Sequence, residues 1–359
     1  MIKALLLTAY LLGHTAISMV LNAPISPSDQ ISLTPPEVCN WADNKTAAIS
    51  VTIDDGHYES AVKFNELQKK YNVHSTQFLI ADAIAGNEER VKGWSDIFSE
   101  GYMDIGNHSA GHEIRYDESD SYTADELDRD INGAYTTLKE LFPEQDVLAF
   151  ATPWGQNSQT TDALIREKHY ANRSVGGGIV YWDTSVLYKL GSHVITFDTT
   201  AEELNSMTDK AISGGGWYIQ LHHGLGDEGN AGDLITDITA CEKHFEYIKE
   251  QSDAGKLWSG SFNDVIKYIC ERKTAKIEML WTGKRSIGLR LTDDMGDDDL
   301  FDYPITLKVY LPDSWNGRIK VIQKSGTAIY PIESEDGVKF AYINVVPDRG
   351  NTIIKMNAW

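Results

Sequence analysis

Between residues 45 and 273, short apolar runs alternate with longer segments whose apolar residues recur every three or four positions. The short runs have the length and composition of buried strands, and the longer segments have the period of amphipathic helices. The expected strands are Ala47–Ile53, Thr76–Ile80, Met103–Gly106, Val147–Phe150, Tyr170–Val175, Val194–Phe197 and Gly216–His223. The expected helices are Ser60–Tyr71, Val91–Gly101, Thr123–Leu141, Gln159–Lys168, Ala201–Ile212, Cys241–Ser252 and Ser261–Lys273. This alternation predicts an α/β fold in which helices cross over between parallel strands of a sheet or barrel.

The pattern changes at residue 275, after which only short β-rich runs follow, separated by Gly, Asp, Asn and Pro clusters. Residues 275–359 are therefore expected to form a small all-β sandwich, with the boundary near Lys273–Lys276. The expected β runs are Lys276–Trp281, Ser286–Thr292, Ile305–Tyr310, Ile319–Gln323, Phe340–Val345 and Thr352–Lys355. Residues 24–46 are rich in Pro, Ser, Thr and Asn, and we expect them to form an extended lead-in to the domain of residues 47–273.

Residues 1–23 resemble a secretory signal peptide, because Lys3 precedes an apolar run and Ala23 offers a small residue for cleavage. The apolar run is short and broken for a membrane span. We therefore expect a secreted or periplasmic protein without a membrane span in the mature chain. Three cysteines, Cys39, Cys241 and Cys270, are too few for a disulfide framework. Cys270 pairing with Cys241 or with Cys39 is one reading, and three buried thiols is the other.

Acidic residues outnumber basic ones by 53 to 32, and the formal net charge is −21. A chain of this charge is repelled by nucleic acid and by anionic membranes, which argues against both as partners. A hydrophobic content of 42% allows a large core and argues against disorder.

Polar and titratable residues stand where several of the expected strands end. These residues are Asp54 and Asp55, His108, Pro153 and Trp154, and His223. The active site of an α/β barrel is assembled at the carboxyl ends of its strands. The recurrence therefore predicts one site built from all of these strand ends.

The most specific local patterns are Asp54-Asp55-Gly56 and the two histidines of His108-Ser109-Ala110-Gly111-His112. Two adjacent carboxylates repel each other unless a cation or a proton neutralises them. Histidines at i and i+4 share one face if the segment is helical. A carboxylate and two imidazoles leave a coordination position open, as in catalytic divalent metal sites. Taken singly, the acids also fit a solvated turn and the histidines a packed surface pair.

In this order along the chain, four motifs resemble those of the polysaccharide deacetylase family, also described as the NodB homology domain or carbohydrate esterase family 4. The motifs are Thr52–Gly56, His108–His112, Thr152–Gly155 and Ile219–His223, and the resemblance covers about residues 45–270. It implies a distorted (β/α) barrel that removes acetyl groups from N-acetylated glycans or O-acetylated xylan. It also implies one divalent metal, commonly Zn²⁺, with Co²⁺ or Ni²⁺ as alternatives. The substrate partner would be an acetylated glycan, and the oligomeric state stays open.

The resemblance assigns Asp55, His108 and His112 as metal ligands and makes Asp54 the general base. The split is chemically reasonable because Asp54, spared from ligation, can take a proton from an activated water. The family's late histidine serves as the acid. We assign that role to His223 rather than His222, because Ile219, Leu221 and His223 share one strand face. Sugar contacts are expected from Pro153, Trp154 and Tyr116, with Trp182 as a further candidate and Trp217 expected in the core.

One position departs from the family pattern. Ala151 stands where the third motif usually has an arginine that holds the base carboxylate, and Arg173 or Arg115 could replace it. The aspartate that orients the catalytic acid has only Asp183 and Asp198 as candidates. Ala151 and the expected C-terminal β-sandwich leave open a carbohydrate-binding protein with a degenerate site. A related hydrolase of non-peptide C–N bonds on the same scaffold is the second alternative. The acidic run of residues 293–299 is expected to be a solvated loop rather than a calcium site.

Overall fold

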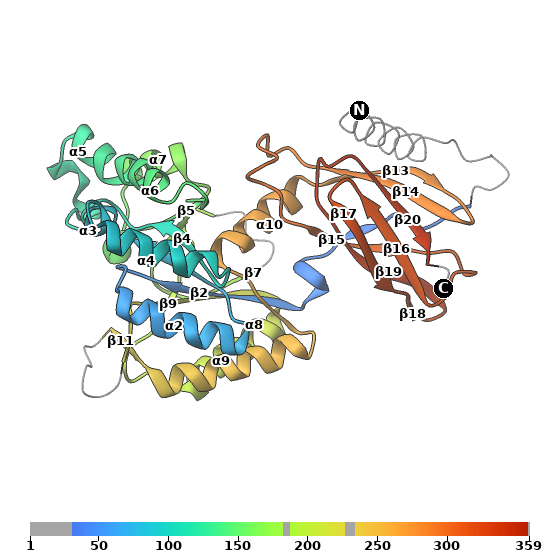
Figure 1. Ribbon diagram of the computed structural model, residues 1–359, viewed down its shortest axis with the longest axis horizontal. Helices are drawn as coiled ribbons and strands as arrows, with labels where there is room; N and C mark the ends of the chain where they lie inside the picture. Colours follow the sequence, from blue (N-terminus) through green and yellow to red (C-terminus); the bar gives the residue numbers. More distant parts are fainter. Residues whose placement is uncertain (1–30, 182–186, 227–233, 358–359) are drawn as a thin grey trace, which may run out of the picture. The chain divides into compact units, whose positions relative to one another are not determined.

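The computed structural model describes residues 31–181, 187–226 and 234–357, and these form two compact units (Figure 1). One unit comprises residues 45–269, and the other combines the described residues up to Asn44 with those from Cys270 onward. The segment expected as a lead-in to the α/β domain therefore belongs largely with the β-rich unit. Its strand β1 (Glu37–Val38) pairs antiparallel with β15 (Ile305–Tyr310), so the lead-in adds a strand to a sheet formed mainly by the C-terminal residues.

The α/β unit is built on a curled, mainly parallel sheet. Along the sheet the strand order is β6 (Ala171–Arg173), β5 (Ala149–Ala151), β4 (Met103–Asn107), β3 (Ser75–Leu79), β2 (Ala47–Ile53) and β9 (Gly216–His222). β12 (Leu257–Ser259) pairs parallel with the start of β2. Beyond β9 lie β8 (His193–Val194), which is parallel to β9, and β7 (Ile179–Tyr181), which is antiparallel to it. A further parallel pair joins β10 (Gly224–Gly226) and β11 (Ile235–Asp237).

The two ends of this sheet are joined by the residues that precede β8. Arg173 of β6 forms a parallel bridge with Leu190, and the Ser174 N–H donates to the carbonyl of Leu190 at 2.7 Å. The same segment continues into β8, which pairs with β9. Backbone hydrogen bonds thus complete an irregular ring, and the predicted distorted (β/α) barrel with a separate small β domain is confirmed.

Helices surround the barrel (Figure 1). They are α2 (Tyr58–Tyr71), α3 (Ala81–Ile84), α4 (Glu88–Ser99), α5 (Ala124–Asp128), α6 (Ala134–Leu141), α7 (Gln159–Lys168), α8 (Ala201–Gly214), α9 (Ile238–Asp253) and α10 (Phe262–Thr274). Strand side chains alternate between the two faces of the sheet. In β2 the residues Ile49, Val51 and Ile53 belong to the core beneath the helices, whereas Ser50 and Thr52 belong to the other set and face the barrel interior.

The helix expected over Thr123–Leu141 contains an unpredicted irregularity. It begins with the predicted capping box, in which the Thr123 side chain bonds the Glu126 backbone and Glu126 bonds back. Between α5 and α6, however, one π-helical turn spans Arg129–Gly133. Such single turns change the direction of one side chain and often occur near functional sites.

The β-rich unit has two antiparallel sheets, as the sequence predicts for a sandwich. One has the order β13 (Lys276–Thr282), β14 (Ser286–Thr292), β20 (Asn351–Met356), β16 (Arg318–Gln323), β17 (Gly326–Pro331). The other has the order β1, β15, β19 (Val338–Val345), β18 (Glu333–Glu335). Alternate residues of their strands, such as Leu289 and Leu307, are fully buried.

Cys39, Cys241 and Cys270 are all buried, and they form no disulfide among the described residues, so the reading of three packed small side chains holds rather than a bridge. Among the helices described here, none combines the length and the apolar character needed to cross a bilayer. The expected signal peptide of residues 1–23 lies outside the described residues.

Candidate metal centre and catalytic site

The side chains of Asp54 and Asp55, which follow β2, have different surroundings because the backbone turns between them. The Asp54 N–H still continues the sheet by donating to the carbonyl of His222 at 2.8 Å. Asp55 and Gly56 then adopt φ values of +70° and +75°. A positive φ is unusual for a residue with a Cβ and marks a backbone held by its surroundings. As a result Asp54 is buried, whereas the Asp55 side chain keeps 24% of its surface exposed.

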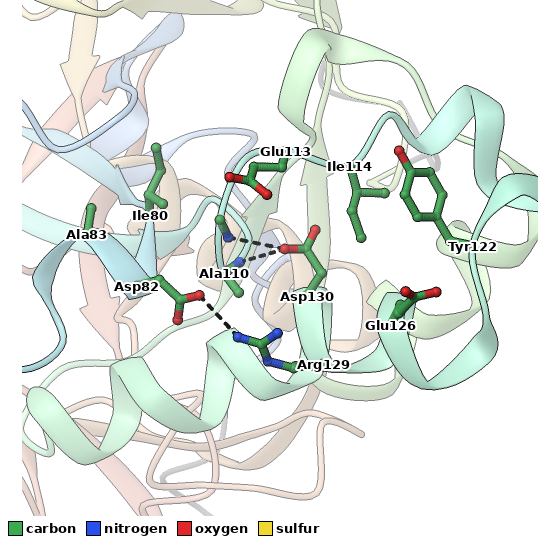
Figure 2. A pocket seen from close by; sticks show the side chains of 11 residues that line it. Ile80, Asp82, Ala83, Ala110, Glu113, Ile114, Tyr122, Glu126, Arg129 and Asp130 are labelled. Carbon is green, nitrogen blue, oxygen red and sulfur yellow. Dashed lines mark hydrogen bonds and ion pairs between the residues drawn. The ribbon is translucent and has the colours of Figure 1, made fainter.

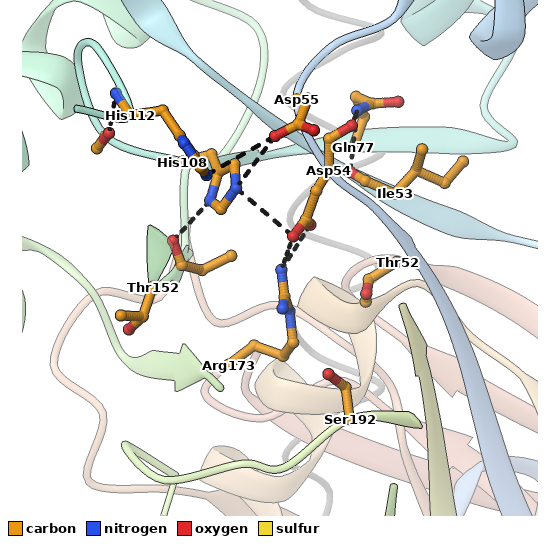
Figure 3. Close-up of polar contacts among 12 residues, drawn as sticks. Thr52, Ile53, Asp54, Asp55, Gln77, His108, His112, Thr152, Arg173 and Ser192 are labelled. Atoms are coloured by element: carbon orange, nitrogen blue, oxygen red, sulfur yellow. Dashed lines mark hydrogen bonds and ion pairs between the residues drawn. The ribbon is translucent and has the colours of Figure 1, made fainter. Parts of the chain in front are cut away.

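Asp55, His108 and His112 come together as a potential metal-binding group (Figure 3). One ligand atom from each lies within 4.8 Å of the others. His108 Nε2 is 3.5 Å from Asp55 Oδ1, and His112 Nε2 is 3.9 Å from the same oxygen. The opposite nitrogen of His108, Nδ1, is 2.8 Å from the Ala151 carbonyl, a contact that requires a proton on Nδ1. Nε2 therefore faces the carboxylate, to which it donates when the ring is protonated, and it can offer a lone pair to a cation when the ring is neutral. This donor set suits a borderline divalent cation such as Zn²⁺.

The histidine pair does not lie on a helix, contrary to the expectation from its spacing. Residues 108–112 form a loop in which Ser109 and His112 have φ values of +68° and +57°. The loop brings the two imidazoles to 4.8 Å between ring centroids. The convergence of the two rings therefore comes from a strained turn rather than from helical periodicity.

Asp130 holds this loop from the opposite side, within a cavity of about 720 Å³ (Figure 2). Its Oδ1 accepts from the N–H groups of Ala110 and Gly111 at 3.1 and 3.2 Å, and its Oδ2 accepts from the Tyr116 hydroxyl at 2.7 Å. Asp130 lies in the π-helical turn of Arg129–Gly133. Sequence reasoning missed this residue, because a one-turn irregularity within a well-patterned helix leaves no trace in the apolar period.

Opposite charges within the group favour ionised Asp55. Burial opposes its charge, but a hydrogen bond with His108 and the nearby imidazoles outweigh burial, so the pKa of the Asp55 carboxyl lies well below its ordinary value. Burial likewise opposes the charged form of His108, yet the Asp54 and Asp55 carboxylates raise its pKa. Burial and the charge of His108 lower the pKa of His112. An array with this balance favours the occupation of its centre by a cation.

Asp54 is held by Arg173. The Arg173 Nη2 contacts both carboxylate oxygens at 2.5 Å, and both side chains are almost fully buried (Figure 3). Ala151 pairs with Arg173 in the register of β5 and β6, so the arginine stands one strand away from the position at which the family pattern places it. Of the two candidates for this role, Arg115 is instead on the surface and pairs with Asp117 at 3.0 Å.

The histidines at the end of β9 have different surroundings. His222 is buried, where its ring bonds Thr236 Oγ1 at 2.8 Å and packs on Phe64, and burial followed by the charge of His244 lowers its pKa to about 3. His223 instead lines a cavity of about 340 Å³ together with Asp54, Asp55, His108 and His112. In the described part of the chain, nothing bonds the buried His223 Nδ1. Asp198 is exposed, and Asp183 lies outside the described residues.

The expected sugar-contacting residues divide into one that reaches the cavity and two that do not. Trp154 lines it with 57% of its surface exposed and packs against His112 at 4.9 Å between ring centroids. Pro153 is buried in the short turn Pro153–Gly155, where it supports a Trp154 backbone with a φ of +60°. Tyr116 was predicted to contact sugar and does not, because it is fully buried with its hydroxyl on Asp130. Trp217 is buried as expected, and Trp182 lies outside the described residues.

Comparison with known proteins matches residues 42–172 to the polysaccharide deacetylase family model. This range contains Asp54, Asp55, His108 and His112 and ends one residue before Arg173. A gellan lyase from a Bacillus species is 28% identical over 342 residues. That match covers 90% of this chain but only 13% of the relative, so the chain spans a small part of the length of that protein.

Solved structures with similar folds are more distant in sequence. One is a carbohydrate esterase domain of a multidomain xylanase from the hindgut metagenome of Trinervitermes trinervoides, with 14% identity and a TM-score of 0.43 over 62% of this chain and 90% of that one. Another is a family 4 acetyl xylan esterase from Clostridium thermocellum in complex with a cobalt ion, with 15% identity and a TM-score of 0.43 over 61% and 89% of the two chains.

Proposed function

Because residues 42–172 make this chain a member of the polysaccharide deacetylase family, we propose that it is a metal-dependent hydrolase that removes acetyl groups from a carbohydrate. The observation that carries the proposal is the arrangement of two kinds of carboxylate in one cavity. Asp55 joins His108 and His112 in a cation-binding group, while the neighbouring Asp54 is held by Arg173. In a site of this kind one carboxylate, Asp55, can bind the cation while the other, Asp54, stays available for proton transfer.

When bound by Asp55, His108 and His112, a divalent cation would polarise the acetyl carbonyl and favour ionisation of water. Asp54 is the general base in this proposal. Arg173 holds the Asp54 carboxylate by an ion pair. Asp54 Oδ2 lies 3.5 Å from His108 Nε2, so the Asp54 carboxylate faces the cation-binding group without being one of its ligands. A base held in this way can accept a proton from water without losing its position.

His223 is the general acid in this proposal, because it faces the cavity that holds Asp54 while His222 is locked in the core. It would protonate the departing sugar nitrogen or oxygen. Water and substrate approach from the exposed side, where Trp154, Val175 and Leu234 keep 57%, 42% and 46% of their surfaces exposed. Such apolar surface around a polar centre suits the C–H faces of a sugar ring.

The physiological substrate in this proposal is an acetylated polysaccharide outside the cytoplasm. The name of the matched relative, a gellan lyase, adds gellan to the candidates. The signal-peptide character of residues 1–23 supports the export that this proposal includes. Zn²⁺ is the first candidate metal, with Co²⁺ and Ni²⁺ next.

Acetate release from a panel of acetylated glycans, namely acetylxylan, chitin oligosaccharides, peptidoglycan and acetylated gellan, tests the proposal. We expect release from at least one member, its loss on chelation and its return with Zn²⁺. Asp54→Asn should retain bound metal, measured by elemental analysis, and lose activity. An Asp54→Asn protein that turns over at the wild-type rate would refute the base assignment.

Two other outcomes would redirect the proposal. Glycan binding without any acetate release, with metal bound, would indicate a degenerate site. The lack of an arginine at position 151 favours that reading, but Arg173 on the adjacent strand supplies an arginine to Asp54. Hydrolysis of small cyclic amides but of no acetylated sugar would indicate a related C–N hydrolase.

A further inference from the structure

His169 is a buried histidine that the proposed mechanism does not use. It follows α7 directly, only 2% of its surface is exposed, and its ring packs edge-on against Tyr135 and Phe150 at 5.4 and 5.3 Å between centroids. Burial lowers the pKa of its imidazole to about 4, so the ring is neutral near pH 7. A neutral imidazole has one nitrogen that donates and one that accepts, and the contacts of the two nitrogens show which is which.

The tautomer of His169 is set by α7. Its Nδ1 lies 3.1 Å from the carbonyl oxygen of Ile165, which can only accept, so Nδ1 carries the proton. The lone pair of Nε2 then faces the side-chain amide nitrogen of Asn107 at 3.1 Å. His169 is therefore a fixed hydrogen-bond acceptor for Asn107.

Asn107 is the last residue of β4 and directly precedes the ligand His108. Its Nδ2 donates to the Ile131 carbonyl at 2.9 Å as well as to His169, and its Oδ1 accepts from the Ser109 N–H at 2.9 Å. With the amide turned over, its oxygen would face two acceptors and its amino group would face a donor. The neighbours of Asn107 thus allow one orientation of its side chain.

This orientation extends to the second histidine ligand. The N–H that Asn107 accepts belongs to Ser109, whose φ is +68°. Ser109 Oγ accepts in turn from the His112 N–H at 2.9 Å, and His112 has a φ of +57°. A series of hydrogen bonds therefore runs from His169 through Asn107 and Ser109 to the backbone of His112. It stabilises two backbone conformations that are costly without such support.

The series reaches the loop of residues 108–112 at different points from Asp130, which accepts from the N–H groups of Ala110 and Gly111. Between them, Asp130, Asn107 and Ser109 provide an acceptor for every N–H of residues 109–112. The loop is thus held on both sides before any cation arrives. Groups that orient metal ligands from behind change metal affinity by about 10-fold to 100-fold when they are removed.

We propose that His169 is a positioning residue of the metal centre, which acts through Asn107 and Ser109 and touches neither the cation nor the substrate. The inference rests on the proposed function and deepens it, because it gives the end of α7 a part in the affinity for the cation. The role requires a hydrogen-bond acceptor at the place of Nε2 rather than a histidine as such.

The test measures Zn²⁺ affinity by competition titration, and thermal unfolding without metal shows whether each variant is folded. His169→Phe keeps the aromatic packing and removes the acceptor, whereas His169→Gln supplies an amide oxygen that can accept from Asn107. Tyr188→Phe is the matched control, because the Tyr188 hydroxyl donates to the backbone carbonyl of His169 at 2.8 Å and not to its ring. Asn107→Ala, alone and combined with His169→Phe, completes a double-mutant cycle.

We expect His169→Phe to weaken Zn²⁺ binding about tenfold. His169→Gln should stay within about threefold of the wild type, because the hydrogen bond to Asn107 is kept. Tyr188→Phe should bind Zn²⁺ as the wild type does. In the Asn107→Ala background His169→Phe should have no further effect, because the residue through which it acts is gone.

Wild-type affinity in His169→Phe, an equal loss in Tyr188→Phe, or additive losses in the cycle would overturn the positioning role. The His169→Gln result decides by itself if His169→Phe does not fold, since retained affinity supports the role and a loss of about tenfold overturns it. A wild-type protein that binds no divalent cation would instead overturn the proposed function, and this role with it.

Discussion

Arg173 gives the sharpest test of the catalytic arrangement, because the buried carboxylate of Asp54 depends on it. Both Asp54 oxygens lie 2.5 Å from one guanidinium nitrogen. Charges whose centres are about 4 Å apart attract each other by about 4 kcal/mol at an effective dielectric constant of 20. Each 1.36 kcal/mol is a factor of ten in rate. We therefore expect Arg173→Ala to lower kcat/KM between about 10²-fold and 10³-fold.

The same variant should lose stability, since breaking one half of a buried ion pair costs roughly 3–5 kcal/mol. Urea unfolding measures this loss and separates it from the catalytic effect. Arg173→Lys keeps the positive charge but not the planar fork, so its activity should fall between those of the wild type and the alanine variant.

The register of β5 and β6 supplies a matched rescue. Ala151 pairs with Arg173, and paired residues of adjacent parallel strands lie about 4.8 Å apart and face the same side. In the double variant Ala151→Arg, Arg173→Ala, an arginine should reach Asp54 again from the neighbouring strand. We expect its kcat/KM to return to within about tenfold of the wild-type value. A double variant no better than Arg173→Ala, or an Arg173→Ala protein with the wild-type kcat/KM, would refute the reasoning.

Three further predictions concern the metal, its loop and the barrel interior. Zn²⁺ at 100 times its dissociation constant should stabilise the wild-type protein by about 2.7 kcal/mol in thermal unfolding but should not stabilise Asp55→Ala. Asp130→Ala, which frees the loop bearing both histidines, should weaken Zn²⁺ binding about 10-fold to 100-fold in a competition titration, whereas Asp82→Asn in the same cavity should not. Burial, with the charge of Asp264, raises the pKa of Asp104 to about 8 from an ordinary 3.8. The folded protein then holds a proton that the unfolded chain loses, so stability falls as pH rises from about 4 to 8, by at most about 6 kcal/mol. Asp104→Asn should remove this slope in urea unfolding across that range, and an unchanged slope would contradict it.

Most of the barrel was predictable because its signals are local. The apolar run Ala47–Ile53 and the helix Gln159–Lys168 have the predicted bounds, and the capping box at Thr123 marks the start of its helix. Strands of two or three residues, such as β7 and β12, carry too few side chains to show a period. Strand β1 was missed for a different reason. Its hydrogen bonds are made to β15, more than 250 residues away, and the sequence of neither strand indicates this pairing.

The candidate site divides in the same way. Asp54, Asp55, His108 and His112 stand in short motifs, so their meeting in one cavity could be predicted from the sequence. The roles of Asp130 and Arg173 depend on contacts that only the folded chain shows. Asp130 reaches the loop from a π-helical turn, which the sequence pattern does not show. Tyr116 is buried and donates its hydroxyl to Asp130, so the prediction that Tyr116 contacts sugar was wrong.

The position of Arg173 shows that, in a ring of strand ends, residues on two different strands can fill the same role, although a sequence motif fixes only one of them. Side chains alternate along each strand, so each strand end presents one inward position, and Asp54, Ala151, Arg173 and His223 belong to this inward set. A carboxylate at the centre can be held by an arginine from either neighbouring strand, but only one such cation can be paired. A second arginine at position 151 beside Arg173 would be a buried charge without a partner, which costs roughly 3–5 kcal/mol. Arginine on β5 and arginine on β6 are thus mutually exclusive solutions to one electrostatic requirement, and the alanine at 151 is the complement of the arginine at 173.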